Sequence, residues 1–325
     1  MPIISTSNYK NRPWYLLNGH METIVPSLLG YVDGVEYDRE RLELVDGDFL
    51  DLDWMKSAGN TKLMVITHGL EGSADRYYVK RTAKFFHKIG WDILAWNCRS
   101  CSNEINRLPR FYHHGDTDDL SSVIDHGLSE NAYDSMVLVG YSMGGSMSLK
   151  YLGEGRVLPG AVKGAVTYSV PCSLRSSGEQ LRVKGNRLYE KRFLDKLVAK
   201  VKLKGALSPE HIDLQGIDQL DDFDAFHLKY TVPLHGFDDL DDFYAKCTCD
   251  QFFSTIQQPA LIVNALNDPL LGDKCYPYDL TNQNPNIYLE TPKKGGHVGF
   301  TLRNDEYSYM EYRAAAFIDE KISLF

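Results

Sequence analysis

From residue 62 onward, the chain alternates short apolar runs with segments of helical periodicity. Apolar runs predict strands at 63–67, 92–96, 136–139, 165–168, 260–264 and 286–289. Between them, apolar residues recur at helical spacing, which predicts helices at 79–86, 120–128 and 309–318. Strands that are apolar throughout are covered on both faces, so we expect an α/β protein with a mostly parallel, twisted sheet and helices on both faces. This alternation alone does not distinguish a dinucleotide-binding fold from a hydrolase fold.

Two segments depart from this rhythm. Residues 41–45 and 49–54 have the pattern of two strands, and the sequence Asp-Gly-Asp between them is typical of a hairpin turn. From 171 to 255 the alternation stops, and helical segments rich in Arg and Lys precede an acidic stretch. An insertion of this length usually packs over the strand ends as a cap, although a solvated helical excursion is the alternative. We therefore expect one domain, 1–325, with a cap or lid at 171–255.

Composition excludes several classes of protein. Of the 325 residues, 43% are hydrophobic and 24% are charged, which is typical of a globular chain with a sizeable core. The net charge of −9 argues against a nucleic-acid partner, because phosphates require clustered Lys and Arg. No window reaches the ~20 apolar residues of a membrane span; the uncharged stretch 135–149, for example, is diluted by Ser and Gly. The first residues lack the pattern of a signal peptide, so we expect a cytoplasmic protein without stable membrane insertion.

The six cysteines indicate neither a disulfide framework nor a metal site. Cys98 and Cys101 form a CxxC pair, but no second CxxC and no nearby pair of histidines completes a zinc site. We expect free thiols.

The strongest chemical signal is the segment 140–144, GYSMG, which matches the G-x-S-x-G pattern. It follows the predicted strand 136–139 and opens a helical run. A sharp strand-to-helix turn lifts the serine hydroxyl out of the sheet, and glycine on both sides relieves the crowding. We therefore expect Ser142 to be a nucleophile.

A serine hydroxyl needs a base to take its proton and an acid to orient that base. Asp268 follows the strand 260–264, and His297 lies in a glycine-flanked loop after the strand 286–289. The order Ser, Asp, His is that of α/β-hydrolases, so we expect Ser142, Asp268 and His297 to form the triad, with Asp273 as the reserve acid.

The oxyanion of an acyl-transfer reaction needs hydrogen-bond donors. The strand 63–67 runs into His68-Gly69-Leu70, where a hydrolase fold places its first donor. We expect the backbone N–H groups of Leu70 and Met143 to form the oxyanion hole. His68 precedes the nucleophile and is expected to pack the loop.

Several further segments make the chain resemble the YheT-like branch of the α/β-hydrolase superfamily, a group of carboxylesterases. Segment 18–24, NGHMETI, resembles the N-x-H-x-Q-T element of that branch, and segment 107–120 resembles its N-R-x-x-x-x-Y-H-x-G-x-T-x-D-L stretch. Segments 223–224 and 233–237 resemble its F-D and P-x-H-G-F elements. The resemblance covers nearly the whole chain and implies an α/β-hydrolase fold with a helical cap and the triad named above.

The chain departs from the pattern of this branch at two positions. Ser100 follows Arg99 where Gly is frequent, and Glu22 stands where Gln is common. Some animal relatives carry a membrane anchor and act on phospholipids; this chain shows no such anchor, so lipid activity is not inherited from the resemblance.

From these features we expect a serine esterase that cleaves small carboxylic esters, including acyl or lipid esters, without a metal or organic cofactor. The alternatives are an acyltransferase that uses the same triad, and a non-catalytic binding protein on the hydrolase fold. Aromatic residues in the predicted cap suggest a gate over an apolar acyl pocket, with the cap's own core as the competing interpretation: Phe223, Phe226, Phe237, Phe243 and Tyr244.

Overall fold

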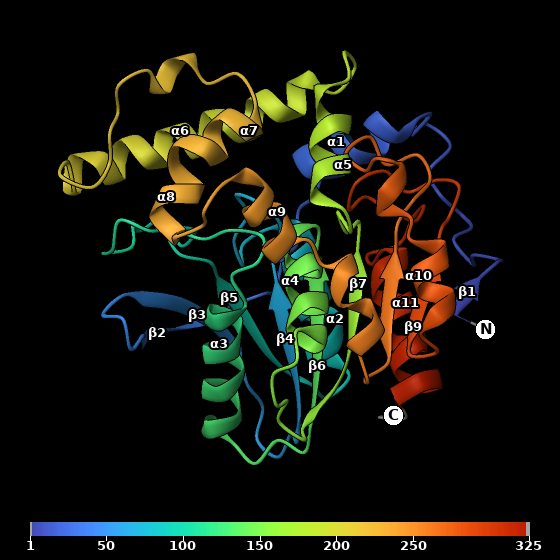
Figure 1. The fold of residues 1–325 in the computed structure, drawn as a ribbon. Coiled ribbons are helices and arrows are strands. Elements are labelled where there is room, and N and C mark those ends of the chain that lie inside the picture. The colour runs from blue at the N-terminus through green and yellow to red at the C-terminus, as the bar shows by residue number, and fades with distance from the viewer. Residues whose placement is uncertain (1, 323–325) are drawn as a thin grey trace.

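One mixed sheet organises the protein. The computed structural model describes residues 2–322, and within that range nine strands join in the order β1-β9-β8-β7-β6-β4-β5-β3-β2 (Figure 1). The strands are β1 (Ile3–Ile4), β2 (Asp38–Glu43), β3 (Phe49–Met55), β4 (Lys62–Thr67), β5 (Asp92–Asn97), β6 (Ser135–Tyr141), β7 (Val162–Tyr168), β8 (Ala260–Val263) and β9 (Ile287–Glu290). Strand β3 is antiparallel to both of its neighbours, β2 and β5, and every other pairing is parallel.

The apolar runs of the sequence coincide with strands of this sheet, and the predicted hairpin is the β2–β3 pair. The sequence pattern did not predict β1, whose two residues pair with Leu289 and Glu290 of β9. The predicted fold class, a mostly parallel α/β-hydrolase sheet, is confirmed.

Helices lie on both sides of the sheet and beyond its upper edge in Figure 1. They are α1 (Gly19–Leu29), α2 (Tyr77–Lys88), α3 (Thr117–Glu130), α4 (Met143–Gly153), α5 (Leu174–Arg182), α6 (Arg187–Leu207), α7 (Phe223–Phe226), α8 (Val232–His235), α9 (Leu240–Cys247), α10 (Tyr278–Gln283) and α11 (Tyr309–Phe317). Short 3-10 turns occupy Ile217–Gln219, Asp250–Thr255 and Asp273–Cys275, and π-helical turns occupy His227–Thr231 and Ile318–Ile322.

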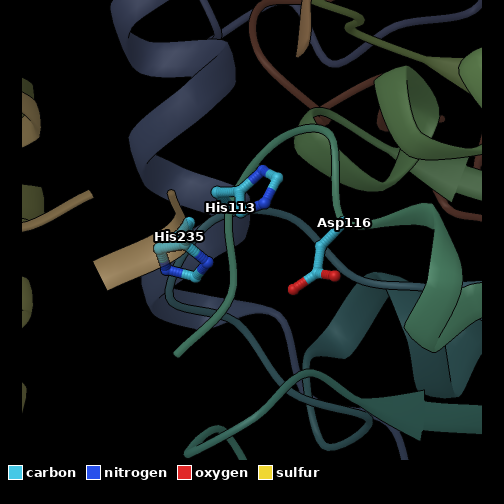
Figure 2. A group of neighbouring side chains, drawn as sticks. All are labelled: His113, Asp116 and His235. Carbon is cyan, nitrogen blue, oxygen red and sulfur yellow. The ribbon is translucent and has the colours of Figure 1, made fainter. Parts of the chain in front are cut away.

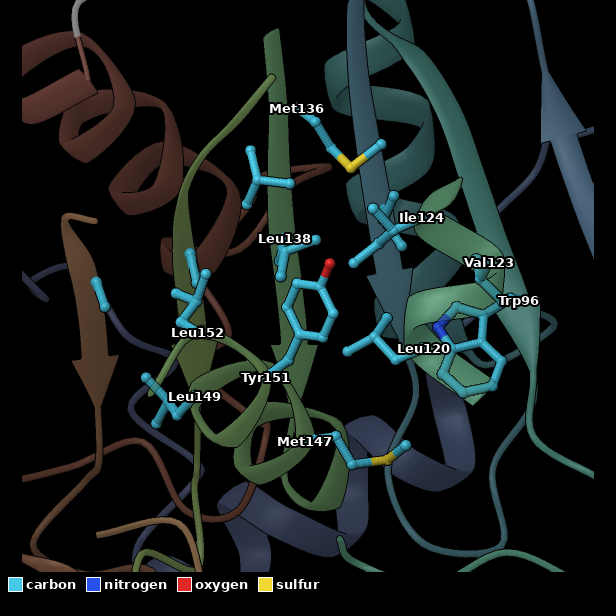
Figure 3. Packing of buried hydrophobic residues seen from close by; sticks show 14 of the residues in the cluster. Trp96, Leu120, Val123, Ile124, Met136, Leu138, Met147, Leu149, Tyr151 and Leu152 are labelled. Atoms are coloured by element: carbon cyan, nitrogen blue, oxygen red, sulfur yellow. The ribbon is translucent and has the colours of Figure 1, made fainter. Parts of the chain in front are cut away.

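The two faces of the sheet bury different sets of side chains. On one face, Leu63 and Val65 of β4 join a cluster with α3 and α4, part of which is shown in Figure 3. On the other face, Met64 and Ile66 of the same strand pack with α2 and α11. Because successive residues of a strand point to opposite faces, burial on both sides requires an uninterrupted apolar run.

The 171–255 segment leaves the layered part of the fold after β7 and returns before β8. Helices α5 to α9 lie above the sheet in Figure 1, and several of their residues lie beside Ser142, which follows the end of β6. The segment has an apolar interior of its own, formed around Phe223, Phe226 and Tyr230.

Two findings concern the cysteines and the search for a membrane-spanning helix. All six cysteines are free and buried, and burial raises the pKa of the Cys98 and Cys101 thiols, so neither is an activated thiolate. Within the described part of the chain, no helix has the length and apolar character needed to cross a bilayer.

Candidate active site

Ser142 lies in a strained turn between β6 and α4. Its backbone has φ 54° and ψ −117°, a conformation that a residue with a Cβ rarely adopts. The flanking glycines make this turn possible, because a Cβ on Gly140 would lie 2.4 Å from the carbonyl oxygen of Gly144, and one on Gly144 would lie 2.3 Å from that of Thr67. Strain of this kind persists only where the surrounding structure holds it, and it presents the hydroxyl at the end of the sheet.

The structure brings the three predicted site residues into one hydrogen-bonded chain. His297 Nε2 lies 3.0 Å from Ser142 Oγ, and His297 Nδ1 lies 2.9 Å and 3.1 Å from the two carboxylate oxygens of Asp268. Asp268 is 4% exposed, and its Oδ1 also accepts the N–H of Leu270 at 2.9 Å. The reserve acid, Asp273, is exposed in a 3-10 turn and is not part of this chain. This geometry allows the imidazole to accept the serine proton while the carboxylate orients the ring.

Helix α1 anchors the loop that carries His297. Thr23 Oγ1 accepts the backbone N–H of His297 at 2.8 Å. Glu22, 1% exposed, accepts the Gly295 N–H at 3.1 Å and the side-chain amide of Asn267 at 2.6 Å. The residue before the acid and the loop before the base are therefore joined through one buried carboxylate.

In the sequence, Glu22 stands out only as a departure from a family pattern, and these positioning contacts were not predicted. The resemblance of 18–24 to a family element was the one signal that could have indicated them, because the contacts join positions that are 245 or more residues apart. Helix α1 itself begins with Asn18, whose side chain accepts the Met21 N–H.

The loop after β4 passes directly beside the serine. A Cβ on Gly69 would lie 3.2 Å from Ser142 Cβ, and the next residue, Leu70, lines the same cavity as Ser142. Met143 is the first residue of α4, so its N–H lies in the helix turn that has no intrahelical acceptor. Met143 directly follows the nucleophile and Leu70 lines its cavity, so their N–H groups stay the predicted donors for an oxyanion.

His68 packs this loop, as expected. It is fully buried; its Nδ1 lies 2.7 Å from the Gly69 carbonyl oxygen, and its Nε2 accepts the Cys98 N–H at 3.1 Å. Burial lowers the pKa of His68 to about 4, so the ring is neutral at pH 7.

The second departure from the family pattern, Ser100, occupies a left-handed turn with φ 63°. That conformation favours glycine, which is frequent at this position in the branch that the chain resembles. Here the Ser100 hydroxyl hydrogen-bonds with Asn106, whose N–H it accepts at 3.1 Å. The turn therefore keeps its geometry without glycine.

Two cavities meet at Ser142 and His297. The first, which we call the basic cavity, has a volume of about 120 Å³ and contains Arg76, Arg192 and Lys196 in its wall. The second, which we call the apolar cavity, has a volume of about 60 Å³ and is lined mainly by Leu, Phe, Tyr and Pro side chains. Leu70, Phe193 and Leu270 line both. Of the five aromatic residues considered for a gate, those in the apolar cavity wall are Phe223, Phe243 and Tyr244.

Phe226 and Phe237 pack away from the site instead. Phe226 is 1% exposed in the interior of the 171–255 segment, and Phe237 packs on Phe243 with ring centroids 5.3 Å apart. All five residues belong to or pack against apolar clusters formed mainly by the 171–255 segment, and three of them also line the apolar cavity; a gate stays a prediction.

A cluster of possible metal ligands lies outside these cavities. His113, Asp116 and His235 offer ligand atoms within 4.8 Å of one another and face a common space (Figure 2). The Asp116 carboxylate, however, accepts hydrogen bonds of 2.8 Å and 2.9 Å from Arg110, and His113 Nδ1 accepts the Gly115 N–H at 3.1 Å. His235 Nε2 is buried without a hydrogen-bond partner, but the guanidinium paired with Asp116 repels cations, so we assign no metal to this cluster.

Comparison with known proteins agrees with this architecture. Residues 59–271 match the family described as "Serine aminopeptidase, S33". The chain is 32% identical over 292 residues to "Putative esterase YheT" of Escherichia coli (strain K12), covering 87% of this chain and 84% of that protein. It is 27% identical to "Phospholipase ABHD3" of Mus musculus over 82% of this chain and 67% of that protein.

Among solved structures, a Pyrococcus furiosus esterase, Pf2001, superposes with a TM-score of 0.58 at 17% identity, covering 88% of this chain and 91% of that one. At this identity the likeness shows the fold alone. The matched family model and the similarity to YheT show the family itself. The chain belongs to the α/β-hydrolase family that contains the YheT esterase and the ABHD3 phospholipases.

Proposed function

We propose that the protein is a serine hydrolase that cleaves carboxylic esters. The observation that carries this proposal is the continuous chain of hydrogen bonds from Asp268 through His297 to Ser142. A binding protein would have no need for all three groups in this order. The esterase and phospholipase names of the relatives support the same class of reaction.

In the proposed mechanism, His297 Nε2 takes the hydroxyl proton of Ser142 as Oγ attacks the ester carbonyl. Asp268 keeps Nδ1 protonated and stabilises the imidazolium. The N–H groups of Leu70 and Met143 donate to the oxyanion of the tetrahedral intermediate. The C–O bond to the alcohol then breaks, and His297 gives its proton to the departing oxygen.

Water completes the reaction in a second half that mirrors the first. His297 removes a proton from water, the resulting hydroxide attacks the acyl carbonyl, and Ser142 leaves with the proton returned by His297. The products are one carboxylic acid and one alcohol. Every group in this scheme is a side chain or backbone amide of the chain.

We further propose that residues 171–255 act as a cap that forms part of the substrate pocket. Helices α5, α7 and α9 contribute Leu181, Phe223 and Phe243 to the wall of the apolar cavity. A segment whose side chains complete a cavity around the nucleophile is more than a solvated excursion.

Labelling with a fluorophosphonate probe tests the proposed function. The parent protein should be labelled, while Ser142→Ala and His297→Ala should not; Asp273→Asn, which changes an exposed carboxylate outside the site, is the matched control and should label normally. A p-nitrophenyl ester series from acetate to palmitate then measures turnover, and an added alcohol distinguishes acyl transfer from hydrolysis. A folded parent that neither labels nor turns over any ester would favour the binding-protein alternative.

A further inference from the structure

The basic cavity contains three cationic side chains and no acidic one. Arg76 precedes α2, and Arg192 and Lys196 are four residues apart on α6, so two distant elements supply the charges. No Asp or Glu lines this cavity, and within residues 2–322 none of the three cations forms a salt bridge. Neighbouring lysines differ in this respect: Lys191, for example, pairs with Asp195 at 2.8 Å.

Two of these cations converge on a neutral acceptor. Arg76 Nη2 donates to the backbone carbonyl oxygen of Glu71 at 2.9 Å, and Lys196 Nζ donates to the same oxygen at 3.4 Å. Two like charges that share one carbonyl repel each other unless an anion lies between them. Burial, followed by the charge of Arg76, lowers the pKa of Lys196, which reflects the same unfavourable arrangement.

The carboxylate of Glu71 forms no ion pair with them, although its charge raises the pKa of Lys196 and so offsets part of the repulsion. It accepts hydrogen bonds from Lys200 Nζ at 2.5 Å and from the Tyr112 hydroxyl at 2.6 Å. The backbone of Glu71 has φ 52°, a left-handed conformation that is unfavourable for a residue with a side chain. This strained backbone turns the carbonyl toward Arg76 and Lys196 while the carboxylate is held by Lys200. Glu71 directly follows Leu70, so the cations lie next to the predicted oxyanion hole.

The apolar cavity, which meets the basic cavity at Ser142, has the opposite character. No Asp, Glu, Lys or Arg lines it. Its histidines other than His297 are neutral at pH 7, because burial lowers the pKa of His114 to about 4 and that of His227 to about 3. An ester bound at the junction thus meets the uncharged wall of one cavity and, in the other, three cations without a salt bridge.

From this asymmetry we propose that the substrate is an ester of an uncharged acyl group with an alcohol that carries an anionic group, a phosphate or carboxylate. The acyl chain occupies the apolar cavity, and the anion of the alcohol half binds Arg76, Arg192 and Lys196. This inference rests on the proposed ester hydrolysis and specifies its substrate. Phosphate and carboxylate oxygens suit Arg and Lys donors, and a bound anion would offset the repulsion between them.

A set of matched substrates tests the charge and its place in the ester. We would compare 1-butanoylglycerol 3-phosphate with 1-butanoylglycerol, which share the ester and differ in the phosphate. We expect kcat/KM to be at least about tenfold higher for the phosphate ester at low ionic strength and to fall as salt is added. A glycerol monoester of succinate, with its carboxylate in the acyl half, should be a poor substrate. Vesicles that contain phosphatidate, compared with the soluble phosphate ester, distinguish a lipid headgroup from a free phosphate as the source.

Variants of α6 test the residues. In Arg192→Gln/Lys196→Met, the ratio of kcat/KM for the phosphate ester to that for the neutral ester should fall by about tenfold. The charge-retaining pair Arg192→Lys/Lys196→Arg should keep most of the preference. Lys191→Gln removes an exposed cation from the same helix outside the cavity, so it is the matched control and should leave the ratio unchanged.

The outcomes separate this inference from the proposed function. If fluorophosphonate labels Ser142 but the two butanoyl esters react equally, or the succinate ester reacts best, the inference is wrong and the hydrolase proposal stands. If no ester is cleaved, binding still tests the cavity: glycerol 3-phosphate, measured by calorimetry on Ser142→Ala, should bind more weakly when Arg192 and Lys196 are also replaced. Equal binding in both proteins would overturn the inference.

Discussion

At the scale of single residues, the position of His297 depends on side chains from distant parts of the chain. Asp268 holds the ring through Nδ1, and Thr23 holds the backbone of the same residue through its N–H. One contact fixes the tautomer and orientation of the imidazole, and the other fixes the loop from which the ring extends. A substitution at Asp268 and one at Thr23 should therefore have different effects.

Asp268→Asn should abolish most of the activity while leaving the fold intact. The amide oxygen can still accept the Leu270 N–H, but the amide nitrogen cannot accept Nδ1–H, so His297 would take the wrong tautomer. We expect kcat to fall by about 10⁴-fold with little change in Tm. Asn at Asp273 is the control, and a loss of less than about tenfold at position 268 would contradict the assigned role.

Thr23→Val should lower kcat through the loop rather than through the chemistry. The substitution preserves shape but leaves the His297 N–H without its acceptor, which costs about 1–3 kcal/mol for a buried group. We expect the rate of fluorophosphonate labelling and kcat to fall together by about tenfold or more while KM changes little. Thr23→Ser keeps the hydroxyl and should restore both rates. If Ser is no better than Val, the hydroxyl does not position the loop.

The sequence identified Ser142, Asp268 and His297 as neighbours because each follows a strand and their order is restricted. It did not identify Glu22, whose importance depends on a contact with Asn267, 245 positions away. A local pattern carries no information about such a pair. Expected donors such as Leu70 were accessible to sequence reasoning only because the fold places them at the end of a strand.

At the scale of elements, continuous apolar runs predicted strands correctly, whereas some short or polar elements were not predicted. Strand β4 is buried on both faces, so its pattern was plain. Strand β1 has two residues and too little sequence to show a period. Helix α1 contains Pro26 and has its functional contacts on polar residues, so apolar spacing did not reveal it. Elements fixed by their own burial could be predicted, while those fixed by a partner could not.

Within the proposed cap, two phenylalanines should respond differently to the same substitution. Phe223→Ala removes part of the apolar cavity wall, so we expect the preferred acyl chain in the p-nitrophenyl series to become longer. Phe237→Ala removes a ring that packs on Phe243 outside the wall, so Tm should fall with no change in chain preference. Chain-length profiles that change equally in the two variants would show that the wall does not select the acyl group.

At the scale of the whole molecule, buried histidines concentrate where the 171–255 segment meets the loop before α3. His113 of that loop and His235 of the segment have ring centroids 4.6 Å apart. Burial lowers the pKa of His113 well below its ordinary value, that of His235 to about 2 and that of His227 to about 3. The folded protein thus holds these rings neutral at a pH where the unfolded chain, with a His pKa of about 6.5, binds protons.

This difference predicts acid sensitivity. Stability from these histidines is present above pH ~6.5 and is lost as the pH falls toward their folded pKa values, because the unfolded chain gains protons first. Burial raises the pKa of Asp119 and Asp250 to about 6 and also raises that of Asp116 and Glu190, which opposes the trend between about pH 4 and 6. These four carboxyls are fewer than the five histidines whose pKa burial lowers. We expect Tm to fall by at least ~5 °C between pH 7.5 and 5, with faster amide exchange at 223–247. A Tm that does not change over this range would contradict the prediction; His211→Gln, at an exposed ring, should not alter the slope.

Because two cavities meet at the Ser142 hydroxyl, the alcohol has to leave before the water can enter. In the proposed mechanism, Ser142 holds the acyl chain covalently in the apolar cavity while the alcohol leaves through the basic cavity. The space that the alcohol vacates then admits the water for the second half. An alcohol whose anion stays bound to Arg76, Arg192 and Lys196 delays the entry of that water. Departure of the first product would then limit the second step. Acid quenching should reveal a fast burst of total alcohol formed, while free alcohol appears only at the slower steady rate.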